Sequence, residues 1–189
     1  MSGWDDKTVL YWVNIALALA TAASSAGALR FFFVTWRQTT VTKATFTVSI
    51  LVCQAMQFLA LVLSHDVPLV WQVLGALGYV SANLLFWWSV RAYGKHPPAV
   101  AFAPAVPTAL VLDGPYRYVR HPFYASYLLA WLAGCAATAN PWLLLTVLWM
   151  FGFYYAAARS EEQSILQSGL ADTYREYRNR TGMFVPKVV

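Results

Sequence analysis

Charged residues are scarce in this chain of 189 residues, because Asp, Glu, Lys and Arg together make up 11% of it while hydrophobic residues make up 59%. A typical soluble domain is about 25% charged. Four stretches contain none of these four residue types: residues 8–29, 44–64, 67–90 and 122–158. This composition excludes an ordinary soluble domain and indicates a protein whose main solvent is lipid.

The sequence also lacks the motifs by which soluble folds hold nucleotides or metals. It has no Gly-x-Gly-x-x-Gly after a strand pattern, no Walker loop and no His or Cys set with metal-ligand spacing. The two cysteines, Cys53 and Cys135, fall within uncharged stretches. We therefore expect neither a metal site nor a disulfide framework.

The uncharged stretches predict an all-α, multi-pass membrane bundle of about five helices, because roughly 20 apolar residues cross a bilayer as a helix. The last stretch is too long for one crossing and contains Asn140-Pro141, which predicts two short helices joined by a tight turn. We expect one domain over residues 1–189, with helices at about 9–33, 44–64, 69–90, 122–138 and 141–158.

The positions of Lys and Arg predict the orientation, since short cytoplasmic loops retain positive charge. Cations follow the first, third and fifth predicted helices, whereas the connections around His65-Asp66 and Asn140-Pro141 have none. We expect a bacterial inner-membrane protein with its N-terminus outside and its C-terminus in the cytoplasm. The net charge of +5 is divided among three loops on one face, which favours membrane lipids over nucleic acid as its partner.

Two connecting segments are too apolar to be solvated linkers. The segment from Arg91 to His121 contains five prolines yet stays apolar, so we expect a loop packed over the cytoplasmic end of the bundle. The tail after Glu161 has apolar residues at helical spacing, which predicts a C-terminal amphipathic helix with a possible kink at Gly169.

Arg120 and His121 stand immediately before Pro122, which suits the first turn of a helix. Free backbone amides at such a position, together with these two side chains, are suited to binding a carboxylate or an electron-rich ring. The alternative is that Arg120 extends to lipid phosphate and His121 only caps the helix.

The adjacent Glu161 and Glu162 directly follow an uncharged helix. Two carboxylates so near the hydrocarbon boundary are costly unless something pairs with them. They could pair with Arg159 or cap the following helix. A cationic ligand with hydroxyl groups would satisfy them equally well.

Taken together, these segments resemble the isoprenylcysteine carboxyl methyltransferase and phospholipid methyltransferase superfamily of membrane enzymes. The similar residues are Gly-Pro-Tyr at 114–116, Arg-His-Pro-Phe-Tyr at 120–124, Glu161-Glu162, the tyrosines at 174 and 177, and Phe-Val-Pro at 184–186. The resemblance covers about the last eighty residues. In the prenylcysteine enzymes an Arg that contacts substrate stands four residues before the first Glu, and here that residue is Ala157.

The resemblance implies an S-adenosylmethionine pocket at the cytoplasmic ends of the last helices, closed by the preceding loop and the C-terminal segment, with no metal. The implied cofactor contacts are Thr108, Ala109, Leu110, Val111, Tyr116, His121, Pro122, Phe123, Tyr124 and Glu161, and Arg120 is a further candidate. For catalysis we expect Glu162 to act as a base or to orient the acceptor, and Arg159 to pair with an anionic acceptor.

The predicted function is therefore S-adenosylmethionine-dependent methyl transfer to a lipophilic, small or membrane-associated acceptor at the cytoplasmic face. Two alternatives remain: a membrane reductase that uses NADPH, and a non-catalytic membrane scaffold. The pair of glutamates argues against the reductase, because carboxylates repel the phosphates of that cofactor.

Overall fold

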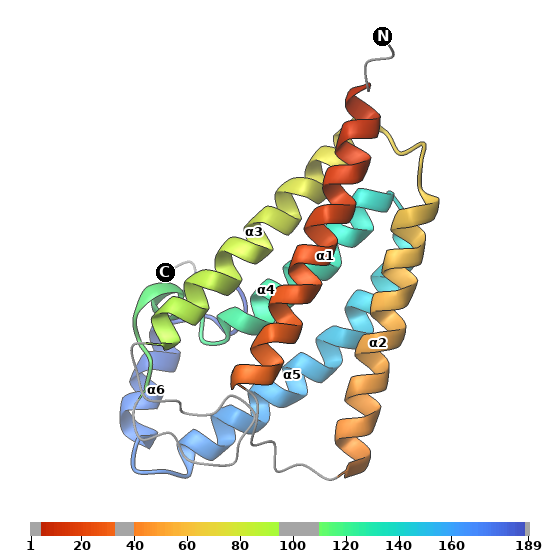
Figure 1. The fold of residues 1–189 in the computed structure, drawn as a ribbon. Helices are drawn as coiled ribbons and strands as arrows, with labels where there is room; N and C mark the ends of the chain where they lie inside the picture. Colours follow the sequence, from red (N-terminus) through yellow and green to blue (C-terminus); the bar gives the residue numbers. More distant parts are fainter. Residues whose placement is uncertain (1–4, 33–39, 95–109, 188–189) are drawn as a thin grey trace.

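The computed structural model describes residues 5–32, 40–94 and 110–187, and in these ranges the chain is helical with one isolated β-bridge. The long helices are α1 (Asp6–Phe32), α2 (Thr40–Leu63), α3 (Leu69–Tyr93), α4 (Pro122–Thr138) and α5 (Leu144–Leu166). The shorter ones are α6 (Ala171–Arg180) and the 3-10 turns η1 (Gly114–Arg117) and η2 (Pro141–Leu143). Figure 1 shows the long helices side by side, with α6 and the C-terminus at one end of the bundle, called here the α6 end.

The predicted all-α membrane bundle is confirmed. Within the described ranges, four helices are long and apolar enough to cross a membrane: Asp6–Gly27, Ala44–Leu63, Leu69–Tyr93 and Pro141–Leu166. The remaining long helix, α4, has 17 residues, which is at the short end of the range that spans a bilayer. The protein is therefore an integral, multi-pass membrane protein, and about five is an approximate number of crossings.

Small residues bring α3 and α4 into close contact. A Cβ added to Gly75 would lie 2.5 Å from the Cβ of Ala137, and one added to Gly78 would lie 2.8 Å from the Cβ of Ala133. Lipid supplies no hydrophobic drive for helix association, so such close packing is what holds membrane helices together. This close packing fixes α4 against α3, and it thereby also fixes the segment that precedes α4.

The turn between α4 and α5 forms where Asn140-Pro141 predicts it. Ala139 ends α4 in the left-handed conformation, with φ of 48°. The Asn140 side chain then accepts a hydrogen bond from the Trp142 backbone amide at 3.1 Å, and Pro141 takes the first position of η2. Helices α4 and α5 consequently run in opposite directions, and α5 returns the chain to the α6 end.

The predicted end of the fifth helix at residue 158 is wrong, because α5 continues to Leu166 and carries Glu161 and Glu162 on its last turns. The C-terminal helix accordingly begins at Ala171, and the break falls around Ser168 and Gly169. The Ser168 hydroxyl donates to the Ile165 carbonyl at 2.6 Å and accepts from the Leu170 amide at 3.1 Å. These bonds satisfy backbone groups that would otherwise be orphaned where the helix stops.

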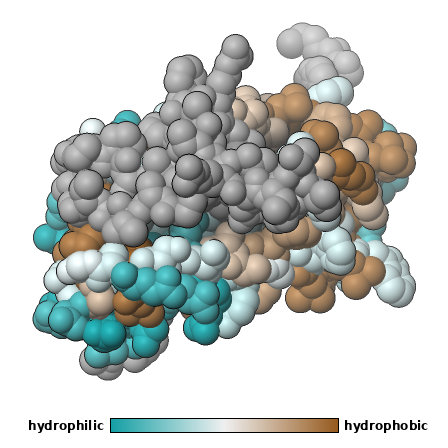
Figure 2. Space-filling model, turned by 90° about the horizontal axis from the view of Figure 1, so that it is seen from below, coloured by the Kyte–Doolittle hydropathy of each residue, from teal (hydrophilic) through white to brown (hydrophobic). Residues whose placement is uncertain are grey.

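Polar and apolar side chains lie on different sides of the α6 end. Figure 2 looks at this end and shows hydrophilic residues gathered on the side where α6 lies, and apolar residues on the side of α2. Exposed charges on α6 include Asp172, Arg175, Glu176 and Arg180. This contrast is expected of a bundle whose helices are embedded in lipid and whose α6 end meets water.

Candidate cofactor site

The segment before α4 packs onto the end of α3 through Gly114. This residue has a φ of 60°, and a Cβ there would lie 2.9 Å from the Cβ of Ala92 and 3.1 Å from Nε1 of Trp88. Both the conformation and the close approach favour glycine. The motif Gly-Pro-Tyr therefore places η1 directly beneath α3.

The C-terminal segment pairs with the residues that lead into α4. The amide of Arg120 donates to the Gly182 carbonyl at 2.8 Å, the amide of His121 donates to the Met183 carbonyl at 3.1 Å, and Val119 forms a parallel bridge with Gly182. These bonds fix the chain from Val119 to His121, so the tail is a structural wall of the candidate site.

A second contact fastens α6 to the same segment. The hydroxyl of Tyr177 donates to the Tyr116 carbonyl at 2.7 Å, and Tyr177 is buried. The hydroxyl of Thr181 donates back to the Tyr177 carbonyl at 2.7 Å. The predicted amphipathic face of the tail, represented by Tyr174 and Tyr177, thus packs on protein at η1 and α5.

Glu162 is the sealed member of the acidic pair. Its Oε1 accepts from Nε of Arg120 at 2.8 Å and lies 3.3 Å from Nε2 of His121, and its side chain is only 2% exposed. Arg120 also donates to the carbonyls of Thr181 and Arg178. Arg120 therefore links α5, α4 and the C-terminal segment in one buried network.

Glu161 is the accessible member of the pair. Its Oε1 accepts from the Tyr124 hydroxyl at 2.7 Å, and its Oε2 lies 3.4 Å from Nδ1 of His121. Its side chain is 22% exposed, against 2% for Glu162. His121 lies between the two carboxylates, so His121 and Tyr124 hold Glu161 in a defined position at which its side chain is partly exposed.

Aromatic rings surround this carboxylate. The ring of Tyr124 stacks on His121 with centroids 5.6 Å apart, and on Tyr154 with centroids 5.4 Å apart. Phe184 of the C-terminal segment meets Tyr124 edge to face at 6.4 Å. The surroundings of Glu161 thus combine a negative charge with flat apolar faces.

The charge of His121 follows from its partners. Burial alone would lower the pKa of His121, but hydrogen bonds to Glu161 and Glu162 outweigh it and raise the pKa above its ordinary value. Burial, followed by the charge of Glu162, raises the pKa of the Tyr174 hydroxyl, which therefore stays protonated. The two carboxylates therefore favour the cationic form of the imidazole that lies between them.

The structure brings together Arg120, His121, Tyr124, Glu161 and Glu162 of the predicted site residues. The partners that the glutamates find are Arg120 and His121 rather than Arg159, and His121 makes no side-chain cap on α4. The alternative that the glutamates pair with Arg159 therefore differs from the structure. The alternative that the His121 side chain only caps α4 also differs from it. The assignment of all five to a cofactor or to catalysis stays a prediction.

The remaining predicted cofactor contacts lie outside the group formed by Arg120, His121, Tyr124, Glu161 and Glu162. Phe123 packs on Phe86 of α3, with centroids 5.6 Å apart, and Pro122 is buried at the start of α4. Tyr116 lies in η1, and burial followed by the nearby charge of Tyr93 and then of Glu161 raises its pKa. Thr108 and Ala109 lie outside the described residues, and Leu110 and Val111 are partly buried before η1.

Arg159, the second predicted catalytic residue, is exposed on α5. Among the residues that the structure describes, it makes no hydrogen bond or ion pair. Its predicted role toward an anionic acceptor also stays a prediction.

The backbone of Thr181, Gly182 and Met183 was not among the predicted site residues, although it shapes the site. A weak signal was present at Gly182, where a Cβ would lie 1.7 Å from the Val185 carbonyl oxygen, so that only glycine fits. Pairing between a tail and a loop sixty residues earlier has no local sequence pattern, which is why the sequence did not indicate it.

Comparisons with known proteins show the family to which this chain belongs. A model of the phospholipid methyltransferase family matches residues 70–172. The match covers more than half of the chain, so the chain belongs to this family of membrane methyltransferases. The predicted resemblance to the wider superfamily is confirmed.

Two relatives carry the name methanethiol S-methyltransferase. The one from Pseudomonas sp. (strain GM41(2012)) is 26% identical over 194 residues, which cover 93% of this chain and 73% of the relative. The one from Mycobacterium tuberculosis (strain ATCC 25618 / H37Rv) is 35% identical over 71 residues, which cover 38% of this chain and 28% of the relative. Both support membership of a methyltransferase family.

Proposed function

We propose that this membrane methyltransferase uses S-adenosylmethionine and methylates a small or lipophilic acceptor at the cytoplasmic face of a bacterial inner membrane. The observation that carries the proposal is Glu161, a carboxylate that is held in place by Tyr124 and His121 yet is still 22% exposed. The proposed orientation has the α6 end in the cytoplasm and the N-terminus outside, because Lys and Arg gather in the connections at that end.

The residues around Glu161 fit the chemistry of this cofactor. A carboxylate accepts hydrogen bonds from an ammonium or from ribose hydroxyls, and the nearby ring of Phe184 suits a flat base or a sulfonium. Arg120 is committed to Glu162 and to backbone carbonyls, so its part is to hold the site together. Glu161 would therefore bind the cofactor, while Arg120 and Glu162 would position His121.

Held by Glu161, the cofactor would supply an activated methyl group to a lone pair of the acceptor and would leave as S-adenosylhomocysteine, and the acceptor would release its proton to solvent. The protein's contribution is to hold the acceptor in line and to exclude water. Glu162 is a poor candidate for a base, because Arg120 and His121 already contact its Oε1. A positioning role for Glu162 fits the geometry better than the predicted catalytic one.

The acceptor is the least defined part of the proposal. Because two relatives are named methanethiol S-methyltransferase, a small thiol is the first acceptor to test. A thiol that ionises becomes a strong nucleophile without a dedicated base at the site.

The test is isothermal titration of purified protein with S-adenosylhomocysteine and, separately, with NADPH, followed by transfer of a labelled methyl group to a short alkanethiol. Saturable binding of S-adenosylhomocysteine and labelled thioether are the expected results. Binding of NADPH alone would support the reductase, and binding of neither would support a non-catalytic scaffold. Either outcome would overturn the proposal.

A further inference from the structure

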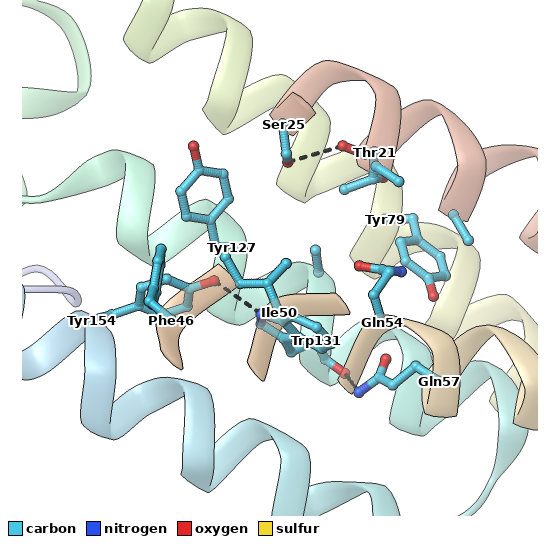
Figure 3. Close-up of a pocket in the computed structure, with 13 residues that line it drawn as sticks. Thr21, Ser25, Phe46, Ile50, Gln54, Gln57, Tyr79, Tyr127, Trp131 and Tyr154 are labelled. Atoms are coloured by element: carbon cyan, nitrogen blue, oxygen red, sulfur yellow. Dashed lines mark hydrogen bonds between the residues drawn. The ribbon is translucent and has the colours of Figure 1, made fainter. Parts of the chain in front are cut away.

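A cavity of about 90 Å³ lies inside the bundle, between the inner faces of α1, α2, α3, α4 and α5. Figure 3 shows its lining, with Gln54 and Tyr79 on one side and Phe46, Tyr127 and Tyr154 on the other. Four of the five helices that line it are membrane-spanning by length and composition. The cavity therefore lies within the membrane-embedded part of the protein.

Three polar side chains of the lining have a group without a hydrogen-bond partner among the described residues, and one of them is the buried Tyr127 hydroxyl. The side chains of Gln54 and Tyr79 line the cavity, and among the described residues neither the Gln54 amide nor the Tyr79 hydroxyl makes a hydrogen bond. Tyr79 is only 6% exposed. Unpaired polar groups in a membrane interior are costly, so these two require a hydrogen-bonding occupant.

The neighbouring polar side chains of Gln57 and Asn83, in contrast, form hydrogen bonds within the protein. Gln57 donates to the Trp131 carbonyl at 3.1 Å and to the Thr146 hydroxyl at 3.0 Å, and Asn83 donates to the Thr21 hydroxyl at 2.6 Å. These bonds join helices and are internal to the protein. Gln54 and Tyr79 are thus left for a ligand on one side of the cavity, and the Tyr127 hydroxyl is also left without a partner among the described residues.

The other end of the cavity adjoins the candidate cofactor site. Tyr154 lines the cavity and stacks on Tyr124 at 5.4 Å, and the Tyr124 hydroxyl donates to Glu161. Phe46 and Tyr127 pack on the same Tyr154 ring, with centroids 6.2 and 5.7 Å away. An occupant that is anchored at Gln54 and Tyr79 would therefore point its other end toward Tyr124 and Glu161.

The volume limits the size of the occupant. One water-sized atom needs roughly 10–15 Å³ of such space, so this cavity has room for roughly six to nine non-hydrogen atoms. A prenyl or fatty acyl chain exceeds that number. The lining contains no charged side chain, so the fitting ligand is uncharged.

We infer that this cavity is the acceptor-binding site, and that the acceptor is a small uncharged molecule with a hydrogen-bonding group at one end and its nucleophilic atom at the other. This inference rests on the proposed function, because it assigns the acceptor of that same reaction. It specifies the position of the acceptor, its size and the two residues, Gln54 and Tyr79, that hold its polar end.

Two thiols of equal size test the inference: 4-mercapto-1-butanol, which carries a hydroxyl, and 1-pentanethiol, which carries a methyl group in its place. Binding of each is measured by titration into protein in nanodiscs with saturating S-adenosylhomocysteine. The preference is the ratio of the two apparent affinities, hydroxyl compound over methyl compound. We expect it to be roughly two- to tenfold higher in the wild type than in a variant that lacks the hydrogen-bonding group, the usual effect of one or two hydrogen bonds. Gln54→Leu and Tyr79→Phe should each reduce that preference, and 1-dodecanethiol should not compete.

Controls separate this inference from the proposed function. Gln167→Leu and Tyr155→Phe make the same chemical changes at exposed positions and should bind both thiols as the wild type does. All four variants should retain the wild-type affinity for S-adenosylhomocysteine. Because the thiols also partition into lipid, each comparison is made between variants in identical nanodiscs.

The possible failures are distinct. An unchanged ratio of the two apparent affinities in both Gln54→Leu and Tyr79→Phe, relative to the wild type in identical nanodiscs, would overturn the assignment of the cavity. Tight binding of 1-dodecanethiol would overturn its size limit. Loss of S-adenosylhomocysteine binding by the wild type would instead refute the proposed function, and the thiol titrations could still be performed on the protein alone.

Discussion

The buried pair of Arg120 and Glu162 gives a quantitative test of how the site is held together. Their side chains are 9% and 2% exposed, and Nε lies 2.8 Å from Oε1. Glu162→Gln keeps the shape but leaves the guanidinium without its counter-charge. Removing one partner of a buried pair costs roughly 3–5 kcal/mol, and we expect about 3 kcal/mol here because the new amide oxygen can still accept one hydrogen bond.

The assay is the free energy of unfolding in mixed micelles for the wild type, Glu162→Gln, Arg120→Gln and the double variant. We expect the double variant to lose less than the sum of the two single losses, with a coupling energy of roughly 1–3 kcal/mol. The matched control is Arg175→Gln, which breaks the 2.6 Å pair with Asp172 on the exposed face of α6. Exposed pairs contribute little, so this control should unfold almost as the wild type does.

Two results would refute this reasoning. One is a loss for Glu162→Gln that is no larger than the loss for Arg175→Gln. The other is strict additivity of Arg120→Gln and Glu162→Gln. Either would mean that the network joining α4, α5 and the C-terminal segment does not hold the site in place.

Three further predictions concern orientation, acceptor and pH. Single cysteines near Lys187 should react only from the cytoplasm and those near Asp66 only from outside, in a background without native cysteines; equal sidedness would remove the predicted orientation. Because Ala157 stands where the prenylcysteine enzymes have a substrate-binding Arg, a farnesylcysteine analogue should be methylated poorly, and efficient turnover would contradict this. The raised pKa of His121 means that its stabilising charge is fully present below about 6.5, its unperturbed value, and is lost as the pH rises through the higher folded-state value. The melting temperature should therefore fall on the alkaline side in the wild type and less so in His121→Gln; parallel profiles would show that the charge on His121 contributes nothing.

The sequence predicted those parts of the fold that depend on local composition. Uncharged stretches marked the membrane helices, and Asn140-Pro141 marked the turn between the last two. The end of α5 was misplaced because charged residues normally end a membrane helix. Here Arg120 and His121 supply partners from elsewhere in the chain, so Glu161 and Glu162 remain helical.

The same distinction applies to the sites. The resemblance indicated Arg120, His121, Tyr124 and the two glutamates, and the structure brings these residues together. The cavity is different, because its lining is assembled from five helices. A lone Gln54 in an apolar helix carries a signal, since a polar residue at membrane depth suggests function, but the sequence alone does not show whether it faces a partner or a cavity.

The most direct test of the central claim is titration of S-adenosylhomocysteine into folded wild-type protein, Glu161→Gln and His121→Ala. If Glu161 binds the cofactor, its loss of charge removes a charge-assisted hydrogen bond worth roughly 1.5–3 kcal/mol, which is about a ten- to hundredfold loss of affinity. We expect a similar loss for His121→Ala, which removes a ring stacked on Tyr124 and a partner of both carboxylates. Wild-type affinity in both folded variants would contradict the assignment of this site to the methyl donor.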